Sequence, residues 1–153
     1  MPSLNYEDIY SAFRTKANAY DLLLLQDSDV NMFMCDWMKA SFRKPYVRRL
    51  FDSISFDDIT QSITYEMKYE VDEESDKDFI IEAMGIGMVI EWITPKINNL
   101  NNIMQVFGSS EEKFYSQSSH LSTLKDLRHS LIKEQRDIIR DRGYIWNSYL
   151  NGE

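Results

Sequence analysis

Proline and glycine, the residues that most often interrupt helices, are scarce in this chain, with three prolines and five glycines among 153 residues. Most of them stand where a helix would begin or end. Between them, apolar residues recur at intervals of three and four, which is the spacing of an amphipathic helix. The sequence therefore predicts an all-α fold, a bundle of about five to six helices with a long C-terminal helix.

A chain of 153 residues can bury enough apolar surface to fold as one domain without disulfides or metal. We expect residues 1–143 to form this single helical-bundle domain and residues 144–153 to form an extended C-terminal docking tail. Cys35 is the only cysteine, so no intramolecular disulfide can form and a reducing compartment is expected. We expect no signal peptide, because the N-terminus carries no basic stretch followed by an apolar run. We expect no membrane helix, because the longest apolar stretch, 79–93, is short and carries two glutamates.

The N-terminal half contains the signals of three helices. A first helix follows a cap at Ser3 or Asn5, and a second begins at Ser28 or Asp29 and ends at Pro45. A third helix is predicted at 55–67 because Ser55 and Asp58 resemble a capping box. Its apolar stripe is Phe56, Ile59, Ile63 and Met67.

The acidic run 72–76 is predicted to be a linker that ends in a helix cap at Ser75. The helix after it is apolar most of the way round, which indicates that other helices surround it. Gly85 and Gly87 are expected to permit close packing of crossing helices. Pro95 is expected to kink this helix or to start a new one that stops at Gly108. The apolar positions are Phe79, Ile80, Ala83, Met84, Ile86, Met88, Ile90, Trp92 and Ile93.

The last predicted helix carries leucine and isoleucine on one side and mixed charges on the other, and it is expected to end just before Gly143. The tail beyond it has no helical period, yet it is rich in aromatic residues. We expect it to pack either on a partner or on its own bundle, and both alternatives stay open. The candidate partner-binding residues of the tail are Tyr144, Ile145, Trp146, Tyr149 and Leu150.

Charge is separated along the chain, although the formal net charge is −8. Five cations and no acid lie between Lys39 and Arg49, while twelve acids and two lysines lie between Asp52 and Glu91. Such a separation can orient subunits head to tail, or it can form two solvated faces without a partner. The second set of candidate partner-binding residues is the basic patch, Arg43, Lys44, Arg48 and Arg49.

Catalytic and metal-binding patterns fail when they are tested residue by residue. His120 and His129 are nine apart on one predicted helix and would point to opposite sides. Cys35 stands among apolar residues and is expected to be a buried structural thiol. A calcium loop starting at Asp72 would need glycine and glutamate where Lys77 and Ala83 stand.

Nucleotide and nucleic-acid binding find little support either. The two glycines at 85 and 87 lack the third glycine and the strand-to-helix setting of a nucleotide loop. An isoelectric point of about 4.8 does not favour tight DNA binding. We therefore expect no enzyme activity, no catalytic residue, no cofactor and no metal.

Several stretches, in order along nearly the whole chain, resemble small virion proteins of tailed bacteriophages of Gram-positive hosts. The chain looks most like the helical adaptor of the head-to-tail connector (neck). It departs from that pattern at 108–110, where a glycine pair is usual, and at Trp146, where a small polar residue is usual. The matching segments are Tyr46–Phe51, Val71–Asp76, Gly87–Trp92, Glu111–Gln117 and Arg140–Ile145.

The resemblance implies a virion structural protein at the head-tail junction, present in the host cytoplasm before assembly. It implies a dodecameric homo-oligomeric ring that binds the portal protein and further neck or tail proteins. DNA would pass through the lumen of this ring without specific binding. The alternative is a cytosolic helical regulatory module that binds one host or phage protein, and the presence of the chain in purified virions would distinguish the two.

Overall fold

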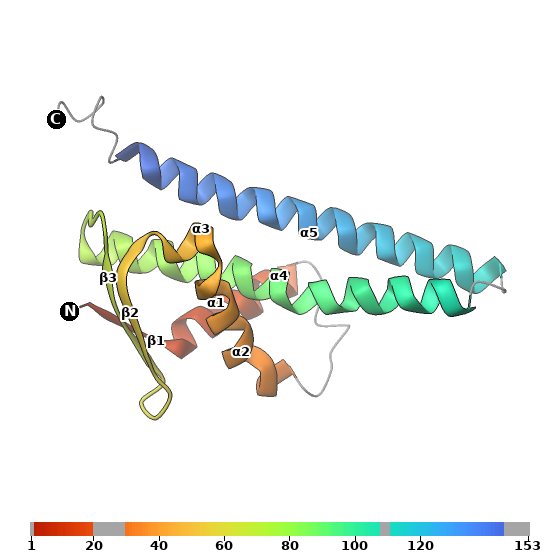
Figure 1. Ribbon diagram of the computed structural model, residues 1–153, viewed down its shortest axis with the longest axis horizontal. Helices are drawn as coiled ribbons and strands as arrows, with labels where there is room; N and C mark the ends of the chain where they lie inside the picture. The colour runs from red at the N-terminus through yellow and green to blue at the C-terminus, as the bar shows by residue number, and fades with distance from the viewer. Residues whose placement is uncertain (1, 20–29, 108–110, 146–153) are drawn as a thin grey trace.

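A computed structural model describes residues 2–19, 30–107 and 111–145 of the chain (Figure 1). This part contains five helices and a three-stranded antiparallel sheet, so the predicted all-α fold is wrong. Two long helices lie side by side, and the shorter helices and the sheet lie along one of them (Figure 1). The elements are β1 (Ser3–Asn5), α1 (Tyr6–Ala19), α2 (Val30–Arg43), α3 (Pro45–Arg48), β2 (Phe51–Asp57), β3 (Ser62–Met67), α4 (Glu73–Phe107) and α5 (Glu111–Ile145).

The segment predicted as a third helix is a β-hairpin formed by β2 and β3. β3 is the central strand of the sheet, pairing with β2 on one side and with β1 on the other. Ile63, Tyr65 and Met67 are buried and alternate with less buried neighbours, which is the period of a strand. Ile59, placed in the predicted apolar stripe, instead lies in the turn and is 95% exposed.

Asp57 explains why this segment turns instead of continuing as a helix. Its carboxylate accepts hydrogen bonds from the backbone N–H groups of Ile59 and Thr60, at 3.0 and 3.2 Å. An aspartate that bonds the backbone two and three residues ahead closes a tight turn. Gln61 completes it with a φ of 51°, in the left-handed region. These local bonds outweigh the helical spacing of the apolar residues.

α4 is the centre of the core, as its apolar character predicts, and it packs against α1, α2 and α5. The expectation for its two glycines is confirmed. A Cβ atom at Gly85 would lie 2.9 Å from the Ala12 Cβ on α1, and one at Gly87 would overlap the Ser41 hydroxyl on α2. The two glycines therefore let α1 and α2 approach the backbone of α4. Aromatic rings fill the space beside them, with Phe13 and Trp92 at 5.7 Å between centroids.

The start of α4 differs from the prediction by one turn, because Asp72 and not Ser75 caps the helix. The Asp72 carboxylate accepts hydrogen bonds from the Ser75 N–H at 2.8 Å and from the Ser75 hydroxyl at 2.9 Å. Its negative charge also suits the positive end of the helix dipole. Pro95 does not divide the helix, since α4 continues through it to Phe107.

α5 packs along α4 and carries one buried polar residue at their interface. The Gln135 amide nitrogen donates to the Ala83 carbonyl at 2.9 Å, and its amide oxygen accepts from the Tyr46 hydroxyl at 3.0 Å. Gln135 thereby connects α5 with both α4 and α3, and its polar atoms are satisfied despite burial. Among the described helices, none combines the length and the apolar character needed to cross a membrane.

Candidate docking surface

A groove of about 900 Å³ lies between the C-terminal part of α5, the segment that joins α3 to the sheet, and the end of β3 with the two residues after it. Its lining combines apolar side chains such as Leu50, Met67 and Ile139 with five cations and one acid. We call it the basic groove. The charged residues of its lining are Arg49, Lys68, Arg136, Arg140, Arg142 and Asp137.

Some of these cations are engaged within the chain. Arg140 pairs with Asp137 at 3.2 Å, and the Arg136 guanidinium lies 5.8 Å from the centre of the Tyr46 ring. Arg49 and Lys68 form no ion pair with a described residue and are exposed. The groove therefore presents an apolar floor with a surplus of positive charge, which is complementary to an acidic segment that also carries apolar side chains.

The sequence-predicted basic patch is divided among different partners. Lys44 pairs with Glu91 on α4 at 3.1 Å, and Arg48 donates to the Phe51 carbonyl at 2.8 Å. Arg49 lines the basic groove. Arg43 is exposed and has no described ion-pair partner. The separation of charge along the sequence is thus partly neutralised inside the fold, and Arg43 and Arg49 remain available.

The predicted docking tail begins beside the same groove. Gly143, expected to cap the last helix, lines the groove within α5, which continues to Ile145. Its φ lies outside the left-handed region that a helix-ending glycine uses. Tyr144 and Ile145 are the last residues of α5, and the placement of their side chains is not described. Trp146, Tyr149 and Leu150 lie outside the described residues.

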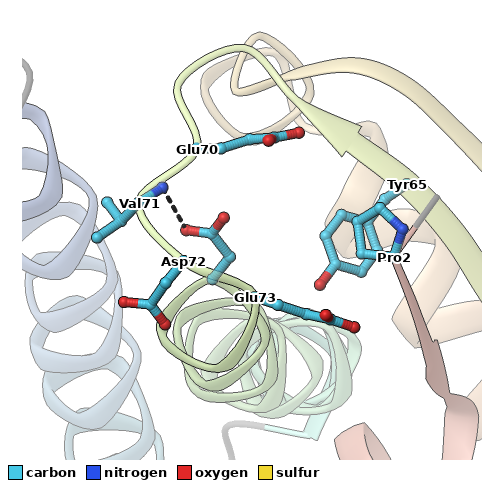
Figure 2. Close-up of a pocket in the computed structure, with 7 residues that line it drawn as sticks. Pro2, Tyr65, Glu70, Val71, Asp72 and Glu73 are labelled. Carbon is cyan, nitrogen blue, oxygen red and sulfur yellow. Dashed lines mark hydrogen bonds between the residues drawn. The ribbon is translucent and has the colours of Figure 1, made fainter.

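A second, smaller pocket of about 380 Å³ lies at the start of α4 and has the opposite charge. We call it the acidic pocket. Figure 2 shows the Tyr65 hydroxyl pointing into the space between Glu70 and Glu73, while the Asp72 carboxylate points away from this space. The full lining is Pro2, Tyr65, Glu70, Val71, Asp72, Glu73 and Asp76.

The carboxylates of the acidic pocket have different roles. Asp72 caps α4, and Asp76 accepts from the Val71 N–H at 3.2 Å, the dashed line in Figure 2. Glu70 and Glu73 form no ion pair or side-chain hydrogen bond with a described residue, and both are exposed. Two carboxylates of this pocket are therefore free to meet a cation.

Tyr65 is the most unusual residue of this pocket. It is only 1% exposed, and its hydroxyl has no hydrogen-bond partner among the described residues. Burial raises its pKa, and the negative charges of Asp76, Glu73 and Glu70 add to the effect, so the hydroxyl stays protonated. Buried polar groups are nearly always paired, so an unpaired hydroxyl at a pocket calls for a partner.

The basic groove and the acidic pocket meet at one ion pair. Arg142, which lines the groove, bonds Asp76, which lines the pocket, at 2.6 Å. Sequence reasoning missed this pair, the α5 cations of the groove and Tyr65. The alternation of Ile63, Tyr65 and Met67 was the available signal, because it indicates a strand that places Tyr65 inside.

Other polar clusters show no ligand geometry. Cys35 is half-buried, and its sulfur lies 4.0 Å from the Asp58 carboxylate. Asp58 also binds Lys39 and the Tyr6 hydroxyl. His129 is exposed on α5, and the side chain of His120 is not described. In the described ranges, no three His, Cys, Asp or Glu side chains are grouped so that they could hold a metal ion.

The matching segments named above include parts of both surfaces. Tyr46–Phe51 contributes Tyr46, Arg49 and Leu50 to the basic groove, and Val71–Asp76 contributes four residues to the acidic pocket. That resemblance rests on the amino-acid segments themselves. Comparisons with protein-family models, with curated proteins and with solved structures find no match to this chain.

Proposed function

We propose that the chain is a virion structural protein, a subunit of the head-to-tail connector. Its copies assemble as a ring on the portal protein, extend the DNA channel and join the head to the tail. The observation that carries the proposal is the basic groove at the end of α5, whose lining extends to Gly143, the residue before the predicted docking tail.

The groove has the composition of an interface and not of a small-molecule site. Its cations stand around an apolar floor, and its lining holds one carboxylate. An acidic segment of the portal protein, with apolar side chains between its carboxylates, is complementary to this lining. The aromatic residues of the tail would add contact area, since tyrosine and tryptophan concentrate binding energy at interfaces.

The exposed face of α4 supports the channel part of the proposal. Glu74, Asp78 and Glu82 are exposed and four residues apart, so they form one stripe along the helix. None of the three forms an ion pair with a described residue. A ring that turns this stripe toward its lumen would repel the phosphates of passing DNA and so prevent it from sticking.

The decisive experiment is to determine whether the protein is a component of purified phage particles. Mass spectrometry of density-purified virions should detect it in a fixed ratio to the portal protein, and a reconstruction should place it at the head-tail junction. If the protein is absent from particles but captured with a single cytosolic partner, the regulatory-module alternative replaces the connector.

Two variants test the docking surface itself. Deletion of 144–153 should preserve helicity by circular dichroism and abolish binding to isolated portal rings. Arg49→Glu with Lys68→Glu should weaken the same binding, more strongly at low salt, because screening reduces charge contacts. Lys125→Glu with Arg14→Glu is the matched control, since it changes the net charge equally at residues that line neither the basic groove nor the acidic pocket. Equal portal binding by both double variants would show that the groove is not the docking surface.

A further inference from the structure

The acidic pocket contains groups whose partner is missing from the described chain. The Tyr65 hydroxyl is buried and unpaired, and the carboxylates of Glu70 and Glu73 stand beside it without a described cation. Such a site requires a ligand that is positively charged and can donate several hydrogen bonds at once. An arginine guanidinium meets both conditions, because it offers five N–H donors in a planar fork.

Arg43 is a described arginine that is free to fill such a site and that does not line the basic groove. Nearby cations are engaged, with Lys39 bound to Asp58, Lys44 to Glu91 and Arg48 to the Phe51 carbonyl. Arg49 lines the basic groove. Arg43 is exposed at the end of α2, and its side chain forms no ion pair or hydrogen bond with a described residue.

Arg43 cannot reach the acidic pocket of its own chain. Its neighbour Lys44 binds Glu91, whereas the pocket lies at Glu73. Both glutamates belong to α4, and their separation of 18 positions corresponds to roughly 27 Å at a rise of about 1.5 Å per residue. A contact between Arg43 and the pocket must therefore join two molecules.

We propose that the acidic pocket receives the Arg43 side chain of a second copy of this chain. The inference rests on the proposed ring, for which it names the contact between subunits. In the complex, the guanidinium donates to the Glu70 and Glu73 carboxylates and to the Tyr65 hydroxyl oxygen. The acidic pocket and Arg43 lie on different parts of the surface of one chain. Each copy can therefore bind one neighbour through its pocket and another through its Arg43. Such head-to-tail contacts close into a ring or extend into a filament.

Charge exchange tests this contact in the full-length chain. Mass photometry or analytical ultracentrifugation should detect concentration-dependent self-association of the unaltered protein. Glu73→Arg and Arg43→Glu should each weaken it by roughly tenfold or more, because each places like charges against one another. The two changes in one chain should recover most of the association, since the opposite charges are restored in exchanged positions.

Matched controls separate the contact from a general effect of charge. Glu74→Arg makes the same change on the neighbouring residue, which is exposed and outside the pocket lining, and Lys125→Glu matches Arg43→Glu on α5. Both should associate like the unaltered protein. Tyr65→Phe should weaken association roughly fivefold while leaving the fold intact, because it removes a hydroxyl that the single chain does not pair.

Several outcomes would overturn the inference. A strictly monomeric protein at all concentrations would do so, as would a double exchange that fails to recover association. Stoichiometric binding of Ca²⁺ from CaCl₂ that Glu73→Arg abolishes would assign the pocket to a metal instead. The proposed function is tested separately. The protein can be found in virions even if the double exchange does not recover association, and it can self-associate through Arg43 even if it is absent from virions.

Discussion

The Arg142 guanidinium and the Asp76 carboxylate form an ion pair of 2.6 Å in which the two side chains are only 9% and 6% exposed. Arg142 also donates to the Tyr69 carbonyl at 2.8 Å and lies 4.8 Å from the centre of the Phe79 ring. One guanidinium thus joins the end of α5, the start of α4 and the segment after β3. The basic groove and the acidic pocket both depend on this connection.

Arg142→Met should lower the free energy of unfolding by about 3–5 kcal/mol, because it leaves the buried Asp76 carboxylate without its counter-ion. Urea denaturation followed by circular dichroism measures the change. Arg140→Met is the control. Arg140 is exposed and pairs with the half-buried Asp137 and the exposed Asp141, so this change should cost about 1 kcal/mol or less. Equal losses in the two variants would mean that the buried pair does not stabilise the fold.

The long helices could be predicted from the sequence because their apolar spacing extends over many turns. The predicted apolar positions of α4 from Ile80 to Ile93 are all buried. Phe79, also predicted, is half-buried, and Val89, which was not predicted, is fully buried. The β2–β3 hairpin could not be separated from a helix by spacing alone. Phe56, Ile59, Ile63 and Met67 fit a helical stripe, and the turn depends on the Asp57 carboxylate bonding two backbone amides.

The candidate site was harder to predict than the fold. Arg49 was expected at an interface and lines the basic groove. Three of the other four cations come from α5, and Lys68 follows β3, so these cations adjoin Arg49 only through packing. Arg142 and Asp76 are 66 residues apart in the sequence. No local pattern indicates a pair at that separation, because it is formed by the way α5 lies along α4.

Gly87→Ala should destabilise the protein by about 1–3 kcal/mol, because the new methyl group would overlap the Ser41 hydroxyl and lie 2.9 Å from the Gln135 amide nitrogen. Thermal unfolding by calorimetry should show the lower Tm. Gly143→Ala is the control, because it adds the same methyl group at a position without close neighbours. Nothing lies within 4 Å of its added Cβ, so helix propensity should leave stability unchanged or raise it by up to about 1 kcal/mol. Similar Tm changes in both variants would contradict the proposed close packing at Gly87.

Pro95→Ala should stabilise the protein by about 1–3 kcal/mol. Pro95 is exposed inside an unbroken helix, where it supplies no N–H group for the helical hydrogen bond to residue 91. Pro45→Ala is the comparison, because Pro45 occupies the first turn of α3, where a missing N–H is tolerated. A loss of stability in Pro95→Ala, measured by urea denaturation, would show that the proline has a role in packing.

Acid should destabilise the protein in part through Asp58, which connects the β2–β3 turn with α1 and α2. Hydrogen bonds from Lys39 at 2.8 Å and from the Tyr6 hydroxyl at 2.7 Å hold the pKa of Asp58 below its usual value. A carboxyl whose pKa is lowered by folding stabilises the folded state above its unfolded pKa of about 3.9. That stabilisation is lost as the pH falls through the lower folded pKa.

Asp58→Asn should therefore reduce the loss of free energy of unfolding that occurs as the pH falls. Urea denaturation between pH 7 and pH 2.5 measures this loss. Lys39→Met should also reduce this loss, because it removes the cation that contributes most to the lowered pKa of Asp58. The two changes together should do little more than Asp58→Asn alone, since one interaction cannot be lost twice. Additive effects of the two variants would show that Lys39 and Asp58 act independently, and the hairpin would then need another connection to α2.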